Sequence, residues 1–452
     1  MNQKPAANVD DVGSEQITGK VFFQTLGCKV NSYETDGIRK LFEEEGFVAT
    51  QILAECDVCV INTCTVTGEA DRKSRQMIRR ARKQAPRAII AAMGCQTQMS
   101  GNSCDADVFC GTMNRSALVE RVIEKMDSLR TGSESHVLPT ETSTERKEYE
   151  EFGPVVSREG TRAFIKIEDG CDNFCSYCVI PYARGRVVSR SPEAVIEEAV
   201  RLGKAGFREI VLTGIHICSY GKDWDNCPDA LFGLLEKLDQ IDSISRIRLG
   251  SIEPNSLDDC FIKKLAAMKK LCPHFHISLQ SGSDSVLLNM GRRYNTARYA
   301  DVAQKLRSKF EELSLTTDII VGFPGETKEE HEASLEFCKA MQFSKIHVFP
   351  FSPRKGTRAA VMSPRIDTAV IAERSRDFLR LSEQMFDDYA RKKVGKTANV
   401  LFESVSEDGS ISGYSKDYFR VVLPPGSKAV TGSEMMVRIT GRHGEAFVAE
   451  CI

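Results

Sequence analysis

The chain has 452 residues, of which 41% are hydrophobic and 27% charged, and its formal net charge is −2. This length is sufficient for two or three domains, and the composition is that of a globular protein rather than a disordered one. A nearly neutral chain is not a globally basic nucleic-acid-binding protein, so any contact with RNA must come from local patches of charge.

The sixteen cysteines are many for a chain that starts with a polar, acidic segment and no export signal. This combination argues against a disulfide scaffold and predicts a cytoplasmic location. No stretch reaches the roughly 18 apolar residues of a membrane span, so a membrane is not an expected partner.

The first region, residues 18–148, alternates strand-like and helical segments, which predicts a doubly wound α/β domain. Its strand-like runs are 21–28, 57–64 and 87–95, and its helical runs are 32–47, 69–84 and 115–126. Residues 130–158 are polar and predict a linker.

Cys28, Cys64 and Cys95 each fall at the C-terminal end of a predicted parallel strand. That edge of an open α/β sheet is where ligands collect, so three thiols in this position can converge on one point. The alternative is that they are small core residues, as expected for Cys59.

A basic helix follows the second of these cysteines, over residues 72–87. Its Lys and Arg side chains are candidates for holding a nucleic-acid backbone, because such cations neutralise phosphates. The alternative is an ordinary solvated helix face.

The second region, residues 157–392, contains six strand–helix repeats. The strand-like runs are 162–168, 208–215, 245–252, 274–280, 316–323 and 345–351. Six such units predict a partial (βα)6 barrel with its active site at the C-terminal strand ends.

Cys171, Cys175 and Cys178 follow the first of these strands with C-x3-C-x2-C spacing. Three thiolates within eight residues suit a cubane iron–sulfur cluster, in which one iron then lacks a protein ligand. A structural zinc site is the alternative, but such sites usually have paired cysteines and a fourth Cys or His.

Polar residues also gather at the C-terminal ends of the predicted barrel strands, where a packed core favours apolar ones. The candidate cofactor contacts are Thr213, Gly214, His216, Ser251, Glu253, Gln280, Ser281, Arg292 and Asp318. Any single Ser, Thr or Asp in this set can instead cap the following helix.

The third region, residues 393–452, changes to short strands joined by Gly, Pro and Ser turns, which predicts a small antiparallel β-barrel. Basic and aromatic residues interleave there, and Lys416, Tyr418 and Arg420 are candidate RNA contacts expected on one exposed strand face. A half-buried strand with aromatic residues inside and charges outside is the alternative.

Together these motifs resemble the radical S-adenosylmethionine (SAM) methylthiotransferase family. The resemblance rests on TLGCKVN, INTCTVT and MGCQTQ in the first region and on CDNFCSYC, LTGIHICSYG, SIEP, LQSGSDS, TDIIVGFPGET and PFSPRKGT in the second. The third region is similar to a TRAM domain, a small RNA-binding barrel. The resemblance covers almost the whole chain except about the first 20 residues and the linker.

This resemblance implies two [4Fe-4S] clusters and SAM as cofactors. Cys171, Cys175 and Cys178 would hold the catalytic cluster, whose open iron binds SAM, and its reductive cleavage gives the radical that takes hydrogen from the substrate. Cys28, Cys64 and Cys95 would hold the second cluster, which carries the incoming sulfur. An electron donor of flavodoxin or ferredoxin type and a sulfur donor are therefore expected partners.

The run TLGCKVN resembles the branch that methylthiolates C2 of N6-threonylcarbamoyladenosine in the tRNA anticodon stem-loop. Sibling branches act on isopentenyladenosine in tRNA or on ribosomal protein S12, and both remain alternatives. A non-enzymatic iron–sulfur RNA-binding protein is an alternative of another class. The threonyl carboxylate needs a cation in a closed site, and the candidates are Arg184, Arg186, Arg292 and Arg354.

Overall fold

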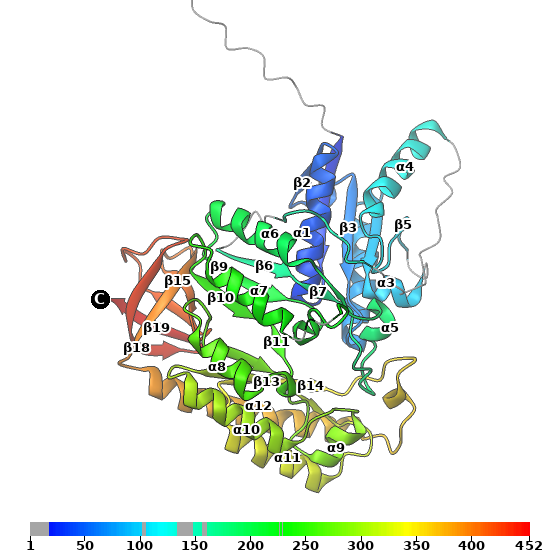
Figure 1. Cartoon of the computed structure of the whole chain (residues 1–452). Helices are drawn as coiled ribbons and strands as arrows, with labels where there is room; N and C mark the ends of the chain where they lie inside the picture. The colour runs from blue at the N-terminus through cyan, green and yellow to red at the C-terminus, as the bar shows by residue number, and fades with distance from the viewer. Residues whose placement is uncertain (1–17, 102–104, 133–147, 156–160, 226, 228) are drawn as a thin grey trace, which may run out of the picture.

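The computed structural model describes residues 18–101, 105–132, 148–155, 161–225, 227 and 229–452. The chain forms a parallel sheet, then a strand–helix partial barrel, then a small β-barrel, which confirms the expected fold class (Figure 1). The expected domain start at residue 157 lies outside the described residues. Most of the expected linker also lies outside the described residues. Two of its described residues, Phe152 and Val155, pack in the hydrophobic core of the N-terminal domain.

The N-terminal sheet is entirely parallel and has the order β2–β1–β3–β4–β5. Its strands are β1 (Gly19–Thr25), β2 (Phe47–Thr50), β3 (Val58–Thr63), β4 (Ile89–Gly94) and β5 (Val108–Phe109). Its helices are α1 (Lys29–Glu44), α2 (Gly68–Gln84), α3 (Cys95–Ser100) and α4 (Ala117–Thr131). Every residue of β3 and β4 is buried, as expected for central parallel strands covered by helices.

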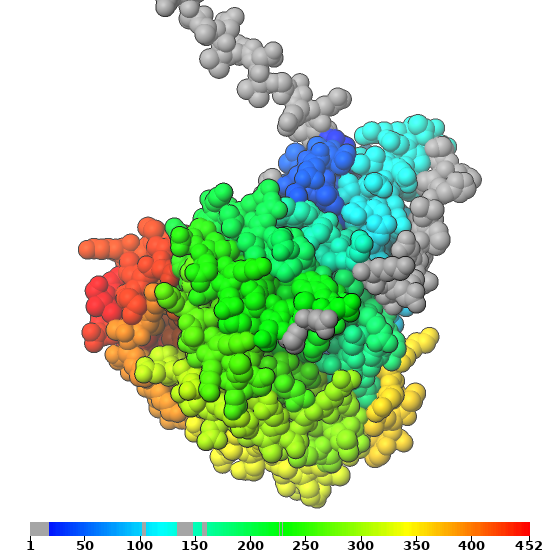
Figure 2. Space-filling model, viewed as in Figure 1, coloured from blue at the N-terminus to red at the C-terminus, as the bar shows by residue number. Residues whose placement is uncertain are grey.

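The central region has six strand–helix units in two hydrogen-bonded sheets, β10–β9–β6 and β11–β12–β13–β14, joined at a parallel bridge between Ile247 and Leu271. The strands are β6 (Arg162–Lys166), β9 (Glu209–Thr213), β10 (Arg246–Leu249), β11 (Ser251–Ile252), β12 (His274–Ile277), β13 (Ser314–Val321) and β14 (Lys345–Pro350). The principal helices are α6 (Pro192–Lys204), α7 (Ala230–Asp239), α8 (Asp259–Ala267), α10 (Thr296–Lys309), α11 (Lys328–Met341) and α12 (Thr368–Lys393). Figure 1 shows helices on the outer side of these strands, and Figure 2 shows the central region, green to yellow, between the blue and cyan N-terminal domain and the orange and red C-terminal barrel.

The C-terminal strands close into a barrel with the order β15–β16–β17–β19–β18. They are β15 (Thr397–Val405), β16 (Ile411–Ser415), β17 (Arg420–Leu423), β18 (Glu434–His443) and β19 (Ala446–Cys451). One pair, β17 with β19, is parallel, so the barrel is not purely antiparallel as expected. Ala390 of α12 lies in its core, and Phe386 and Tyr389 pack against that core, so α12 ties the barrel to the central region.

The partial barrel is hydrogen-bonded to both of the other domains. Tyr33 at the start of α1 donates a hydrogen bond to Glu198 of α6, 3.0 Å away, which joins the N-terminal domain to the barrel. At the opposite, N-terminal ends of the strands, Arg246 and Arg248 donate hydrogen bonds to backbone carbonyls of Tyr414 and Lys416 in the C-terminal barrel. Within the described residues no helix is both long and apolar enough to cross a membrane.

Candidate active site

The three N-terminal cysteines line one cavity of about 1240 Å³. Cys28 follows β1 as the N-cap of α1, Cys64 follows β3, and Cys95 begins α3 directly after β4. Because β1, β3 and β4 are neighbours in a parallel sheet, their C-terminal ends lie side by side.

The turn before Cys28 is shaped to leave room for these thiols. Gly27 has φ +104°, and a Cβ added there would lie 2.7 Å from Sγ of Cys64. A larger residue would therefore displace the Cys64 side chain, which gives the glycine in TLGC a physical role.

The second triad lies in the loop between β7 (Glu168–Asp169) and α5 (Ile180–Arg184). Burial raises the pKa of the Cys171 and Cys178 thiols to about 12. A bound metal reverses this preference, because a coordinating thiol is deprotonated. This loop does not line the cavity itself, although Ile180 and Arg184 of the helix that follows it do.

Each triad has a sulfur that accepts a hydrogen bond from an arginine. Arg184 Nε lies 3.1 Å from Cys95 Sγ, and Arg292 Nη1 lies 3.3 Å from Cys175 Sγ. Hydrogen bonds to ligand sulfurs are typical of iron–sulfur sites, where they stabilise thiolate charge and tune the reduction potential.

The donor sets are of the chemical type that holds cubane iron–sulfur clusters, namely cysteine thiolates. Nowhere in the described ranges do three His, Cys, Asp or Glu side chains form a group that could hold one ion. In a four-iron cubane each thiolate binds a different iron, so the sulfurs need not converge on a single point. Two thiol triads, each with an arginine that donates a hydrogen bond to one sulfur, are therefore compatible with two four-iron cubanes.

Arg184 is held in a buried ionic network that joins the two domains. Its Nη1 lies 2.7 Å from Glu34 of α1 and 3.1 Å from Asp169, and Arg115 and Lys166 contact the same two carboxylates. Burial raises the pKa of Glu34, but the three cations outweigh that effect and hold the pKa well below its usual range. The network fixes Arg184 beside Cys95.

The four arginines expected to receive a substrate carboxylate are all engaged by carboxylates of the protein. Arg184 is held as described, and Arg292 pairs with Glu253 at 3.0 Å. Arg354 pairs with Asp71, 2.5 Å away, and the exposed Arg186 pairs with Asp172, 3.2 Å away. The sequence pattern could not show this, because Glu34, Glu253 and Asp71 are distant in the chain from the arginines that they contact.

The predicted cofactor contacts separate into two groups. Thr213, Gly214, Ser251 and Asp318 line the cavity that holds the N-terminal cysteines. His216, Glu253 and Arg292 form a separate cluster beside the second triad, in which His216 Nε2 lies 3.2 Å from Glu253. Burial raises the pKa of Glu253, but His216 and Arg292 outweigh it and bring the pKa to about 2.

Gln280 and Ser281 are not among the residues that line this cavity. Gln280 has φ +74° and its backbone N–H donates to the carbonyl of Asp318 at 2.9 Å. Ser281 Oγ accepts a hydrogen bond from the backbone N–H of Ser283, which is the local structural role that its residue type allows. Asp318 lies within β13 rather than at its end and accepts a hydrogen bond from His276, 3.1 Å away.

The expectation that Lys416, Tyr418 and Arg420 share one exposed strand face is wrong. Lys416 and Tyr418 lie in the turn between β16 and β17, and only Arg420 lies on a strand and is exposed. Tyr418 has φ +68° and packs against Tyr414 with ring centroids 5.1 Å apart. The chain reverses at this position, so strand alternation does not apply.

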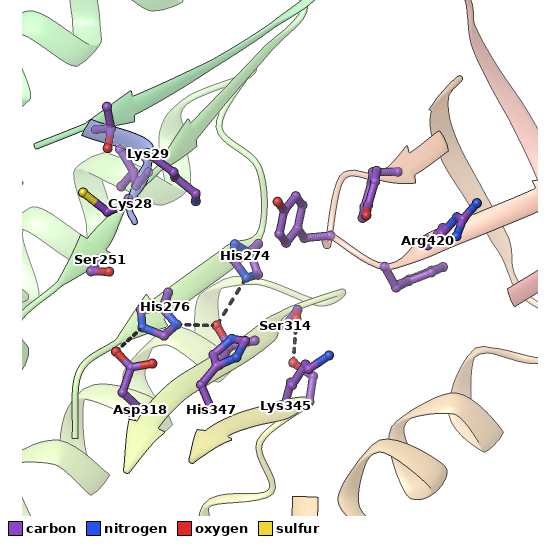
Figure 3. Close-up of a pocket in the computed structure, with 18 of the residues that line it drawn as sticks. Cys28, Lys29, Ser251, His274, His276, Ser314, Asp318, Lys345, His347 and Arg420 are labelled. Carbon is purple, nitrogen blue, oxygen red and sulfur yellow. Dashed lines mark hydrogen bonds and ion pairs between the residues drawn. The ribbon is translucent and has the colours of Figure 1, made fainter. Parts of the chain in front are cut away.

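Sequence reasoning missed a group of polar side chains on the inner wall of the partial barrel. Figure 3 shows His274, His276 and His347 facing the cavity together with Lys29. His276 Nδ1 lies 2.9 Å from Thr316 Oγ1, and burial lowers the pKa of His274 well below its usual range, so that ring is neutral. The alternation of His274 and His276 along β12 is the signal that could have revealed them.

Two family models match the chain. The radical SAM superfamily matches residues 165–338, and the uncharacterized protein family UPF0004 matches residues 20–109. The two matches coincide with the barrel carrying the second triad and with most of the sheet carrying the first.

Curated relatives match nearly the full length. The chain is 40% identical to the threonylcarbamoyladenosine tRNA methylthiotransferase MtaB of Bacillus subtilis, over 93% of each chain. It is 36% identical to the Aquifex aeolicus protein of the same name, over 84% of this chain and 92% of that one. It is 34% identical to the tRNA-2-methylthio-N(6)-dimethylallyladenosine synthase of Pelotomaculum thermopropionicum, over 92% and 94%.

Among solved structures, the radical SAM methyltransferase TsrM from Kitasatospora setae, with cobalamin and a [4Fe-4S] cluster bound, matches with a TM-score of 0.52. The match covers 76% of this chain and 74% of that one at 16% identity, so it supports the fold alone.

Proposed function

The chain belongs to the radical SAM tRNA methylthiotransferase family, and from this premise we propose that it transfers a methylthio group to C2 of N6-threonylcarbamoyladenosine in the tRNA anticodon stem-loop. The observation that carries the chemistry is the pair of cysteine triads, one opening into the cavity and one in the loop before α5. The substrate branch is supported by the 40% identity to the threonylcarbamoyladenosine enzyme of Bacillus subtilis, against 34% to the dimethylallyladenosine enzyme of Pelotomaculum thermopropionicum.

In this proposal Cys171, Cys175 and Cys178 hold one [4Fe-4S] cluster, and the triad of the N-terminal domain holds a second. When bound, these clusters and SAM supply the radical removal of hydrogen and the sulfur and methyl groups, which protein side chains cannot provide. Arg184 and Arg292 stabilise the thiolate charge of one ligand in each set.

The protein's own residues then bind, orient and shield the reactants. Glu253 pairs with Arg292 and so fixes its guanidinium beside Cys175. Thr213, Gly214 and Ser251 line the cavity and are the proposed SAM contacts. His216 acts through Glu253, as a positioning residue.

We assign the tRNA backbone to α2 and to the rim of the C-terminal barrel. Arg75, Arg79 and Lys83 are spaced by four residues, so they share one helix face, and all three are exposed. In the part of the chain that the structure describes, none of them has a carboxylate partner. Arg420, which lines the cavity, and Lys416 in the turn before it are the proposed second contact, and the Tyr418 ring is available for stacking on a base.

An electron donor of flavodoxin or ferredoxin type and a sulfur donor complete the proposed partners, because the reaction consumes electrons and sulfur. We propose a cytoplasmic location, where tRNA is present and thiols stay reduced. All fifteen cysteines among the described residues are free thiols, which supports a reducing compartment.

The test is to reconstitute the purified enzyme anaerobically and supply reductant, SAM, sulfide and two anticodon stem-loops, one threonylcarbamoylated and one isopentenylated. Mass spectrometry of the digested nucleosides should detect the methylthio group on the threonylcarbamoylated loop alone. Product only on the isopentenylated loop would assign the chain to the sibling branch. SAM cleavage with product on neither loop would favour a protein target, and no SAM cleavage would favour a non-enzymatic role.

A further inference from the structure

The cations that line the cavity of the N-terminal cysteines differ in whether they already have a carboxylate partner. Its Lys and Arg residues are Lys29, Arg184, Lys345 and Arg420. Arg184 is neutralised by Glu34 and Asp169, and both carboxylate oxygens of Glu445 lie within 2.9 Å of Lys345 Nζ. Two of the four therefore already have carboxylate partners.

Lys29 and Arg420 are the two remaining cations, and they differ in position. Arg420 lies exposed on β17 of the C-terminal barrel and donates to Ser412 Oγ at 3.2 Å. Lys29 follows Cys28 directly and faces the cavity, and across the described ranges its Nζ has neither a hydrogen bond nor an ion pair. Among the cavity cations, Lys29 is thus the unpaired one beside the reacting centre.

The surroundings of Lys29 favour an incoming anion. Figure 3 shows Lys29 beside Cys28 on the N-terminal domain, and His274 lines the same cavity from β12 of the partial barrel. Tyr418 lines the same cavity, and the guanidinium of Arg248 lies 4.4 Å from the centroid of the Tyr418 ring. Because Arg248 is neutralised by Glu209, it does not compete for a ligand. An anion that reaches Lys29 therefore meets an ammonium group with no ion-pair partner among the described residues.

We propose that Lys29 binds the carboxylate of the amino-acid substituent on N6 of the target adenine and so selects an anionic modification over an apolar one. This inference rests on the proposed function, which places that adenine beside Cys28. A carboxylate held in a closed cavity needs a cationic or N–H donor, whereas an apolar substituent would leave the lysine unpaired. The cavity is long enough to extend from the cysteines to Tyr418, so a substituent can extend along it.

The test compares wild-type holoenzyme with Lys29→Met, Lys29→Gln and Lys29→Arg, and with Lys328→Met as the exposed matched control. The probes are three anticodon stem-loops, carrying a threonylcarbamoyl group, its carboxamide analogue and an isopentenyl group. Binding is measured by fluorescence anisotropy and product by mass spectrometry. Iron content and RNA-independent SAM cleavage verify that each variant is intact.

Wild type should bind the carboxylate loop roughly tenfold to a hundredfold more tightly than the carboxamide loop. Lys29→Met and Lys29→Gln should abolish this preference, Lys29→Arg should keep part of it, and Lys328→Met should keep all of it. An unchanged preference in Lys29→Met, or no preference in the wild type, would overturn the inference. If the inference about Lys29 failed in either way but the wild type still formed product on the threonylcarbamoylated loop, the proposed function would stand. Wild-type product on the isopentenylated loop alone would instead refute the proposed substrate.

Discussion

The Nε–H of Arg184 donates a hydrogen bond to Sγ of Cys95, 3.1 Å away. Arg184 nevertheless lies only six residues after Cys178 of the other triad. One guanidinium therefore contacts the triad of the N-terminal sheet while it is anchored in the helix that follows the other triad. The same side chain is held by Glu34 and Asp169, which come from the two domains. The relative position of the two triads therefore depends on the contacts of Arg184 at the interface between the two domains.

We expect Arg184→Lys to lower the reduction potential of the cluster on the N-terminal triad. Lysine keeps the positive charge but its ammonium cannot reproduce the guanidinium contacts to the sulfur, Glu34 and Asn31 together. Loss of a hydrogen bond to a ligand sulfur makes a cluster harder to reduce. Redox titration followed by electron paramagnetic resonance would measure this, and an unchanged potential at full iron content would contradict it.

The two triads should each hold half of the iron. Anaerobically reconstituted protein should contain about eight irons per chain, as two four-iron cubanes. Replacing Cys171, Cys175 and Cys178 with Ala should halve the iron and abolish SAM cleavage. Iron and SAM cleavage are measured by colorimetry and chromatography.

The matching variant replaces Cys28, Cys64 and Cys95 with Ala. It should also lose half of the iron but keep SAM cleavage, which then runs without methylthio product. If this variant retained all of its iron, the N-terminal triad would be structural and the proposed mechanism would fail.

Removing the exposed stripe on α2 should weaken tRNA binding and reduce its salt dependence. The variant combines Arg75→Ala, Arg79→Ala and Lys83→Ala, all exposed side chains. If each cation neutralises one phosphate, the slope of log affinity against log salt concentration should flatten by about two to three units. Filter binding across a salt series gives the slope, Lys328→Ala serves as the control, and an unchanged slope would move the backbone contact elsewhere.

Glu168 should make stability depend on pH near neutrality. Its carboxyl is fully buried, the backbone N–H of His216 donates to Oε1, and Oε2 has no hydrogen-bond partner in the described structure. Burial raises the pKa of Glu168 to about 8. Because the folded pKa exceeds the unfolded one, the stabilisation from this group is present below pH about 4.5 and is lost as the pH rises through 8.

Glu168→Gln keeps the acceptor oxygen and removes the titration. Relative to wild type, this variant should therefore gain stability as the pH rises from 5.5 to 8.5, by at most about 1.4 kcal/mol per pH unit. Urea unfolding at several pH values measures the difference. Glu197→Gln, on the exposed face of α6, is the control and should show no such trend. A parallel pH dependence in Glu168→Gln and wild type would show that the carboxyl is already ionised.

Much of the fold is local in origin and could be predicted from the sequence. The apolar runs that become β3 and β4 are continuous because both faces of these central parallel strands are covered by helices. The six strand–helix units follow from the change between strand and helix periodicity. The short strands β2 and β5, of four and two residues, were missed because so few residues carry no reliable pattern.

The sequence by itself determined the identity and order of the six motif cysteines, the strand ends that carry them and the resemblance to a family. Only the tertiary structure decided which cations are available. Arg184, Arg292 and Arg354 all looked suitable for a carboxylate, yet each is paired with a carboxylate from a distant part of the chain. Lys29 carried no such signal, and its availability appears only once the fold places it on the cavity lining without a carboxylate partner in the described part of the chain. The physical reason is that ion pairing depends on distances across the fold, which local periodicity does not encode.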